Sequence, residues 1–528
     1  MTVEAPSRDA VNSQDPWEGF TPGPWQNSID VREFILANYT PYTGDASFLS
    51  GPTAKTLNVW ETLQRDYLSV ERAKRVYDVE THIPGDVDAF PAGFICADDN
   101  VIVGLQTDVP LKRPMMPAGG WRMVETAIKE AGLEPDAEIK EGLATAHPWQ
   151  EWLDEQLVQL GDLPVREHVD HSHSSVLRRQ QEFGYTQEDL DVILAPMAMN
   201  GEEALGSMGS DTPIALLSTR PRLLFDYFTE LFAQVTNPPL DAIREELVTA
   251  LSATAGPQPN LLADTREHAR KLQIDFPVIT SDQLAQVAHI GSARAGRGFT
   301  SRTLRCLYRA SGGGQTLRES LEALFEQADR AIEEGVSFLI LSDRETNAEM
   351  APIPSLLATS ALHHHLLRRQ TRTRVGLIVE AGDVREVHHA ALLVGYGATA
   401  VNPYLAMESV EELAKSGYLP GTAPETAVAH LIKALGKGVL KVMSKMGIST
   451  VASYCGAQTF EAIGLSNGVV ERYFTGTASK LGGVGLDVLA AEVAARHRRA
   501  YPDNQAAFAS RRLETGGEYR WRRGEEPH

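Results

Sequence analysis

The alternation of apolar and polar residues changes its rhythm near residue 270. Beyond it, short β-branched runs such as "FPVI", "SFLILSD", "RVGLIVEAG" and "ATAVNP" alternate with longer stretches of helical spacing such as "LRESLEALFEQADRAIEEG". Strand–helix–strand order at this spacing is typical of a mostly parallel sheet. We therefore predict an α/β fold, with a barrel-related strand–helix domain over residues 266–528.

The residues before this domain follow a different pattern. "EIKEGLATAHPWQEWLDEQLVQL" and "YTQEDLDVILAPMAM" carry apolar residues at i, i+3 and i+4, which predicts a helical lead-in over residues 136–265. Residues 17–135 predict a small, mostly helical and loop-rich segment with one strand around residues 101–105, and residues 1–16 a disordered tail. Near the other end, "ISTVASY" predicts a strand, followed by a helix from Gln458.

Charge and hydropathy narrow the class of protein. The formal net charge of −21 argues against nucleic acid or an anionic membrane as a partner. The first twenty residues hold no apolar run suited to a signal peptide, and no stretch approaches the ~18 apolar residues of a membrane span. We predict a cytoplasmic protein.

Cysteine usage limits metal and thiol chemistry. Cys96, Cys306 and Cys455 lie far apart, and no CxxC offers an iron–sulfur or zinc framework. No GxSxG marks a serine nucleophile. Cys455, in "ASYCGAQ" at a predicted strand end, is the best candidate for a reactive thiol, with a small apolar filler as the alternative.

Polar residues follow the predicted strands at their carboxyl ends, where parallel folds place their sites. Asp343, Glu380, Asp383 and Asn402 could line a pocket there. The alternative is that they cap helices, as Asp383 would cap the helix beginning in "VREVHHAALL".

Glycine and histidine clusters each allow two interpretations. "TGTASKLGGVGLDVL" (475–489) could cradle a phosphate or form a tight irregular loop, and "LGKGVLK" has a Gly-Lys pair without the rest of a phosphate loop. His168, His171 and His173 could bind a metal or lie in a solvated loop. His363–His365 fall within one predicted helix, so their rings diverge and form a poor chelate.

The segment "FAQVTNPPLDAIREELV" predicts a stiff break between two helices. Asn237 precedes two prolines, and residues before proline avoid the helical region. The missing proline N–H groups leave the carbonyls of Thr236 and Asn237 unsatisfied, and Asp241 can cap the next helix.

Long strings from about residue 137 to 528 resemble the central domain of the large subunit of bacterial glutamate synthase. They include "HSHSSVLRRQQEFGYT", "VGLIVEAGDVREVHHAALLVGYGATAVNPYLAMESV" and "GKGVLKVMSKMGISTVASYCGAQTFEAIGLS". The resemblance implies a domain that joins glutaminase and FMN domains and helps wall a tunnel for ammonia. "GSMG" and "VTNPP" resemble its constriction, which nominates Met208, Thr236 and Asn237 for the ammonia path.

The same resemblance implies where the chemistry of the parent enzyme lies. That family converts glutamine, 2-oxoglutarate and a reductant into two glutamates. Its glutaminase domain begins with a nucleophilic cysteine, where this chain has Thr2. Its FMN domain and iron–sulfur cluster are expected after "GGEYRWRRGEEPH". We expect no catalytic, cofactor or metal residue in this chain, no activity from it alone, and as partners the glutaminase and FMN domains and the small subunit.

Residues 17–135 resemble a different family, the N-terminal part of pyruvate formate-lyase. "WEGFTPGPWQNSIDVREFILANYTPYTGDASFLSGPT" and "VIVGLQTDVPLKRPMMPAGGWRMVETAIKEAG" carry this resemblance. That family works through an adjacent cysteine pair and a glycyl radical, and this sequence has no Cys-Cys pair. We predict a two-part chimera joined between Gly132 and Glu138. A fragment of a glycyl-radical enzyme and a catalytically silent binding module remain as alternatives.

Overall fold

The computed structural model describes residues 94–97, 100–103, 136–165, 173–204, 220–231, 245–502 and 512–518. The chain forms two compact units, residues 1–148 and 149–528. In the first unit, β1 (Phe94–Ala97) and β2 (Asn100–Val103) pair as an antiparallel hairpin, and α7 (Asp136–Thr145) is a helix. The strand predicted around residues 101–105 is therefore confirmed as β2, whereas the predicted tail of residues 1–16 lies outside the described residues.

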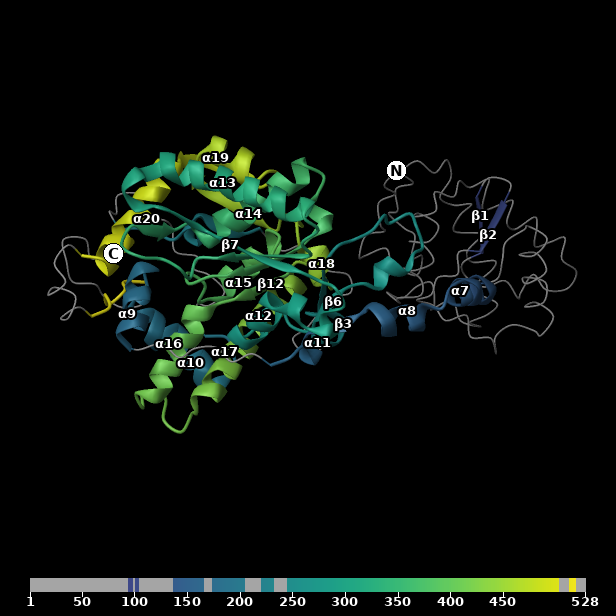
Figure 1. Cartoon of the computed structure of the whole chain (residues 1–528), viewed down its shortest axis with the longest axis horizontal. Helices are drawn as coiled ribbons and strands as arrows, with labels where there is room; N and C mark the ends of the chain where they lie inside the picture. Colours follow the sequence, from purple (N-terminus) through teal and green to yellow (C-terminus); the bar gives the residue numbers. More distant parts are fainter. Residues whose placement is uncertain are drawn as a thin grey trace, which may run out of the picture. The chain divides into compact units, whose positions relative to one another are not determined.

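A parallel sheet is the centre of the second unit (Figure 1). It consists of β7 (Ser301–Arg305), β9 (Phe338–Ser342), β11 (Gly376–Glu380) and β12 (Ala400–Asn402), side by side in that order. A parallel bridge between Val278 and Val401 places the predicted "FPVI" run along the far edge of β12. The predicted α/β fold with a parallel sheet is confirmed. Among the described residues, no ladder joins the two ends of this sheet into a closed barrel.

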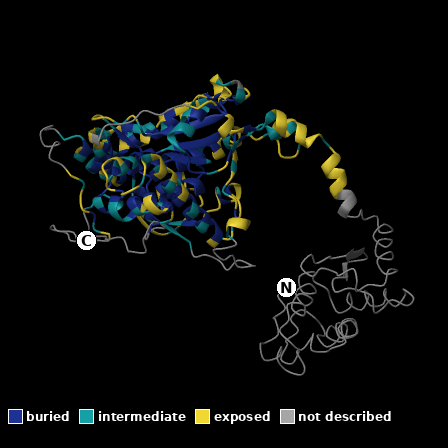
Figure 2. Cartoon of the chain, turned by 90° about the horizontal axis from the view of Figure 1, so that it is seen from below, coloured by how far each residue is buried: buried dark blue, intermediate teal, exposed yellow. Residues whose placement is uncertain are grey.

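Both faces of β9, β11 and β12 are covered, which explains why β9 and β11 are apolar runs. Strand β7, at the edge of the sheet, is polar, and only its Leu304 is buried. On β9, Leu339 and Leu341 belong to a large core cluster, and Phe338 and Ile340 to a smaller one. Helices α13 (Gly313–Glu333), α14 (Ser355–Arg368) and α15 (Val387–Gly395) contribute to the large cluster. The smaller cluster is completed by α12 (Ser281–Ala288), β3 (Val158–Gln159), β5 (Ala253–Ala255) and β6 (Leu272–Ile274). Figure 2 shows buried residues in the interior of the second unit and exposed ones toward its surface.

The predicted helical lead-in is confirmed in part, since short strands β3, β4 (Phe228–Glu230) and β5 interrupt its helices. It contains α8 (Trp149–Gln156), α9 (His173–Glu182), a π-helix (Asp189–Leu194) and α10 (Ala195–Asn200). The π-helix continues directly into α10, so residues 189–200 form one helix whose first six residues are π-helical. Helix α17 (Pro424–Lys445) packs against both α10 and α16 (Tyr404–Lys415). The shorter elements are β8 (Leu307–Arg309), β10 (Met350–Pro352) and α11 (Glu245–Val248).

Two predicted elements near the end of the chain are wrong. "ISTVASY" contains the short helix α18 (Val451–Tyr454), because the Thr450 hydroxyl accepts the Ser453 N–H and starts a helical turn. The helix expected from Gln458 is instead strand β13 (Phe460–Leu465). It pairs antiparallel with β4 (Phe228–Glu230), a partner that local periodicity does not reveal.

The glycine-rich segment 475–489 is not the predicted tight irregular loop. Strand β14 (Ala478–Val484) pairs parallel to β13 across α19 (Asn467–Tyr473), and α20 (Leu486–Ala500) begins directly after it. At Gly483 an added Cβ would lie 2.1 Å from the carbonyl oxygen of Gly464. The glycine therefore allows two backbones to approach closely at a bulged part of the ladder.

Candidate functional site

Two buried carboxylates fasten the loops at the carboxyl ends of β9 and β11. Both oxygens of Asp343 accept the N–H of Gly382, at 3.1 and 3.0 Å. Asp383 accepts the N–H of Ser355 at 3.1 Å and its hydroxyl at 2.6 Å. Asp383 was expected to cap α15, and this is wrong: it satisfies the first residue of α14, whose buried N–H has no acceptor within its own helix.

Burial sets the protonation of this pair. It raises the pKa of Asp343 well above its ordinary value, and the neighbouring Asp383 charge raises it further, against the Gly382 N–H. Burial also raises the pKa of Asp383, while the Ser355 hydrogen bonds and Arg385 lower it. Burial and the neighbouring negative charge therefore favour the protonated form of these carboxyls over the form in which both are ionised.

Glu380 belongs to a chain of ion pairs that crosses the same edge. Arg344 Nε lies 2.6 Å from Glu380 Oε1, and Arg344 Nη1 lies 2.9 Å from Glu408 Oε1. Arg179 Nη2 reaches the other oxygen of Glu408 at 2.7 Å. The guanidinium carbons of Arg344 and Arg179 lie 4.1 and 5.9 Å from the ring centroid of Tyr404. Each charge therefore has an opposite charge beside it.

The remaining predicted edge residue, Asn402, is also tied to the fold. Its Nδ2 donates to the Ile279 carbonyl at 2.9 Å, which holds the end of β12 to its neighbour. The ring of Phe183 covers Gly382, where an added Cβ would lie 2.5 Å from Cε2. The four predicted residues do lie at the carboxyl edge, and their contacts fasten helices and loops there. Of the four, Asp383 alone meets the stated alternative of helix capping, at α14.

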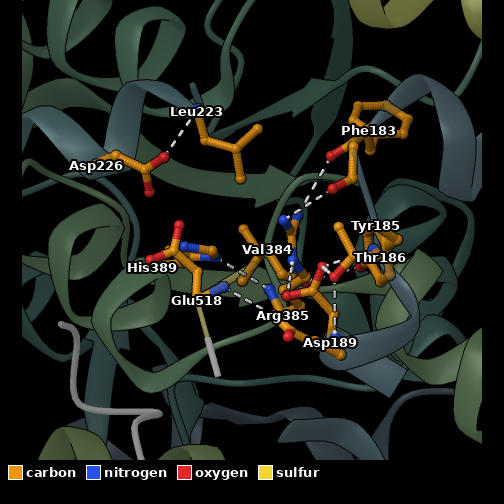
Figure 3. A network of polar contacts seen from close by, with 12 residues as sticks. Phe183, Tyr185, Thr186, Asp189, Leu223, Asp226, Val384, Arg385, His389 and Glu518 are labelled. Carbon is orange, nitrogen blue, oxygen red and sulfur yellow. Dashed lines mark hydrogen bonds and ion pairs between the residues drawn. The ribbon is translucent and has the colours of Figure 1, made fainter. Parts of the chain in front are cut away.

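A second buried centre surrounds Arg385 (Figure 3). Its Nε lies 3.3 Å from Asp189 Oδ1, and its Nη1 and Nη2 donate to the carbonyls of Phe183 and Gly184, each at 3.2 Å. Its guanidinium lies over the ring of Tyr185, 4.6 Å from the centroid. Asp189 is the first residue of the π-helix, so Arg385 locks this rare element to the loop after β11. The sequence did not predict the Arg385–Asp189 pair, because the spacing of apolar residues does not distinguish a π-helix from an α-helix.

The histidine rings of α14 point in different directions, as predicted, and those of His363 and His364 meet edge to face at 84°. Arg372 Nε donates to His363 Nδ1 at 3.0 Å. His365 Nε2 lies 3.1 Å from Asp329 Oδ2, and its ring stacks on Phe325. His173 begins α9, while His168 and His171 lie outside the described residues. Within the described ranges, no group of three His, Cys, Asp or Glu side chains could hold a metal ion.

Cys455 offers a weak nucleophile. It follows α18 instead of a strand, and it is half-buried. Burial raises the pKa of the Cys455 thiol above its ordinary value, against the pull of the neighbouring Arg372. A thiol with a raised pKa is mostly protonated at neutral pH and reacts slowly.

The residues nominated for an ammonia path lie outside the described residues. Met208 falls in 205–219, and Thr236 and Asn237 fall in 232–244. Their place on such a path stays a prediction. In the part of the chain that is described, no helix has the length and apolar character needed to cross a membrane.

At the carboxyl edge of this α/β fold, the described contacts are ion pairs and buried carboxyls that join helices and loops. Residues 178–466 match the family described as the glutamate synthase central domain, and residues 21–160 match the family described as pyruvate formate lyase-like. The chain belongs to the glutamate synthase central-domain family.

Curated relatives agree with this family. The chain is 43% identical over 443 residues to the glutamate synthase [NADPH] large chain of Bacillus subtilis, covering 82% of this chain and 28% of the relative. It is 38% identical over 448 residues to the glutamate synthase [NADH] of Schizosaccharomyces pombe, covering 82% and 21%. The chain thus spans less than a third of the length of these relatives. Each alignment covers more of the chain than residues 137–528 supply, and the pyruvate formate lyase-like match extends past residue 137.

One similar solved structure is the flavin-binding domain of baker's yeast flavocytochrome b2. The identity is 12%, the TM-score is 0.26, and the match covers 57% of this chain and 95% of that chain. A likeness of this size carries no argument about the site.

Proposed function

We propose that this chain is the central, domain-joining part of a cytoplasmic glutamate synthase. The parent reaction converts glutamine, 2-oxoglutarate and a reductant into two glutamates. The observation that carries the proposal is the central-domain match over residues 178–466, supported by 43% identity to the B. subtilis large chain. Glutaminase and FMN domains and a small subunit are the proposed partners, and Met208, Thr236 and Asn237 line the proposed ammonia path.

In this proposal the chain supplies a scaffold, and FMN and the iron–sulfur cluster belong to other parts of the synthase. The packing at the carboxyl edge of the sheet supports this. Phe183 and Tyr404 are buried, Phe183 lies against Gly382 at this edge, and Arg344 and Glu380 form an ion pair there. The chain alone is then inactive in glutamate synthesis.

A segment exchange tests the proposal. Residues 137–528 replace the corresponding segment of the B. subtilis large chain, and glutamine-dependent oxidation of NADPH is measured with 2-oxoglutarate. We expect activity within about tenfold of the parent enzyme, a loss of at most ~1.4 kcal/mol of transition-state stabilisation, and none from the isolated chain. A folded, flavin-loaded exchange enzyme without activity contradicts the proposal.

The ammonia path has its own test in the same exchange enzyme. Met208→Trp adds bulk at the proposed constriction, so the glutamine-dependent rate is expected to fall about tenfold or more, the effect of ~1.4 kcal/mol. The rate with added ammonium salt is the control and should stay within about twofold, less than ~0.5 kcal/mol. An equal fall in both rates would place Met208 off the path.

Residues 17–135 are proposed to be a lyase-like fragment without lyase activity, joined to the synthase part between Gly132 and Glu138. The match over residues 21–160 supports the origin, and the absence of an adjacent cysteine pair from the sequence supports the lack of activity. Formate production from pyruvate and coenzyme A by the purified chain would overturn this assignment.

A further inference from the structure

Residues 512–518, "RLETGGE", form a strap across the start of the π-helix. Thr186 and Glu514 make a parallel bridge. The N–H groups of Gln187 and Glu188 donate to the carbonyls of Glu514 and Thr515, at 2.7 and 3.1 Å. The strap is therefore added to residues 186–188 by main-chain hydrogen bonds, as in a sheet.

Glu188 holds the end of the strap through its carboxylate. Its Oε2 accepts the N–H of Gly517 at 2.8 Å and that of Glu518 at 2.9 Å, and Glu188 is buried. Successive N–H groups that converge on one anion form a nest, and such charge-assisted bonds are the strong ones. At Gly516 the φ angle is +118°, and an added Cβ would lie 2.2 Å from Glu188 Oε2, so only glycine fits.

Glu518 carries the contact onward to a second segment. Its Oε1 lies 2.6 Å from Arg222 Nη1 and 3.1 Å from Arg220 Nη1. The N–H of Arg222 donates to Glu492 Oε1 at 3.1 Å, and its carbonyl accepts from Arg496 Nη1 at 2.7 Å. Residues 220–222 are thus held between the strap on one side and α20 on the other.

The same segment continues into the turn that holds Asp226. Directly after Arg222, the N–H of Leu223 donates to Asp226 Oδ2 at 3.1 Å. Figure 3 draws this contact in the same view as the Arg385 contacts, with a dashed line from Asp226 to Leu223 and none from Asp226 to Arg385. The contacts therefore run without a break from the buried Glu188, through Glu518 and Arg222, to the turn that holds Asp226.

We propose that Glu188 and Glu518 are positioning residues that couple the strap to residues 220–223. A displacement of the chain at Glu518 then shifts Arg222, because both ends of that ion pair are held by further bonds. The role of this link in ammonia delivery rests on the proposed function. In a glutamate synthase the FMN domain would follow the strap, and Arg220 follows in sequence the segment that contains Met208. The link would then match ammonia delivery to the state of the synthase site.

Amide hydrogen exchange of the full chain, resolved to peptides 512–518 and 220–226, tests the coupling. Glu518→Gln keeps the shape of the side chain and removes its charge. We expect exchange in 220–226 to rise about tenfold, the effect of ~1.4 kcal/mol on local opening. Glu188→Gln loosens the strap itself, so exchange should rise in both peptides. Exchange that rises only in 512–518 in Glu188→Gln, or an unchanged 220–226 in Glu518→Gln, overturns the coupling.

Matched variants separate positioning from general loosening. Glu334→Gln removes an exposed ion pair of the same length, Arg302 to Glu334 at 2.6 Å, and should change neither peptide. Arg222→Lys keeps the positive charge. The amide hydrogens of peptide 220–226 should therefore exchange more slowly in Arg222→Lys than in Arg222→Gln. Equal exchange in these two Arg222 variants contradicts a charge-based link. Unchanged thermal unfolding midpoints in Glu518→Gln and Glu334→Gln show that the fold is intact.

The B. subtilis large chain that carries residues 137–528 of this chain tests whether the link affects ammonia delivery. A coupled synthase consumes one glutamine for each NADPH oxidised. In Glu518→Gln we expect this ratio to rise above one, because ammonia is released without being used, while Glu334→Gln stays at one. A ratio that stays at one in Glu518→Gln overturns the functional part. A segment-exchanged B. subtilis enzyme with no activity overturns the proposed function. Amide hydrogen exchange of the chain alone still decides the coupling.

Discussion

Among single residues, Glu182 on α9 shows how burial changes an acid. Its Oε2 accepts the Thr346 hydroxyl at 2.8 Å, and its Oε1 lies 3.8 Å from His497 Nε2. Burial raises the pKa of Glu182 to about 8, against the opposing effects of Thr346, Arg179 and Arg178. Between pH 4.5 and 8 the folded chain therefore holds a proton on Glu182 that the unfolded chain has lost.

This proton predicts how stability depends on pH. Because the folded state binds the extra proton, the Glu182 contribution to the free energy of unfolding falls as pH rises from about 4.5 to about 8. The slope approaches about 1.4 kcal/mol per pH unit inside that window. Glu182→Gln cannot lose a proton, so its stability relative to the native chain should improve from pH 5 to pH 8. Urea unfolding at both pH values measures this, and a constant difference between the two chains would contradict it.

The Asp383–Ser355 contact predicts a large cost for one substitution. Asp383→Ala leaves the buried N–H and hydroxyl of Ser355 without acceptors, which costs about 1–3 kcal/mol per group. Ser355→Ala removes one bond and leaves the other, so it should cost less, about 1 kcal/mol. Urea denaturation of both variants and of the double variant measures the coupling. Strictly additive losses would show that the two residues act separately.

At the scale of elements, glycines set how closely helices pack. "LGKGVLK" suggested a piece of a phosphate loop, but Gly438 lies within α17, against α15. A Cβ at Gly438 would lie 2.2 Å from Cγ2 of the buried Val387. Val387 is β-branched and has few rotamers with which to move away. The glycine is therefore explained by the contact between the two helices.

A pair of glycine substitutions tests this packing. Gly438→Ala forces a clash in the core and should cost about 1–3 kcal/mol. Gly468→Ala, in the exposed part of α19 with no atom within 4 Å of the added Cβ, is the control. It should be neutral or gain up to about 1 kcal/mol, since alanine favours helix over glycine. Thermal unfolding compares the two, and equal midpoints would contradict the close α15–α17 packing.

At the scale of the whole molecule, every described core residue belongs to the second unit. The two hydrophobic clusters begin at Val158 and contain no residue from 1–148. The second unit therefore has its own core, as expected of a part that folds alone.

Deletion of residues 1–148 tests this independence. Because no described core residue is removed, the free energy of unfolding of the remaining chain should change by less than about 0.5 kcal/mol. Circular dichroism during heating measures the transition of both chains. A midpoint that drops by many degrees in the shortened chain would show that the first unit contributes to the stability of the second.

Local pattern was sufficient for the parallel sheet and its helices. The strands at β9 and β11 are continuous apolar runs because both faces are buried, and α13 carries a clear helical stripe. Local periodicity did not predict strand β13, whose pairing strand lies far away in the sequence. β13 depends on β4, more than two hundred residues earlier, and α18 depends on one capping threonine. The polar residues at strand ends were found by the rule for parallel folds, but their bonding partners were not.

The sequence by itself determined the fold class, the edge of the sheet where polar residues gather, and the family, because these depend on order and periodicity along the chain. Tertiary structure alone decided what the charged residues do. Asp383 caps a helix that begins before it in the chain, Arg385 meets Asp189, and Glu518 meets Arg222 across 296 positions. Which charges become neighbours is set by how distant segments pack, and no local pattern records that.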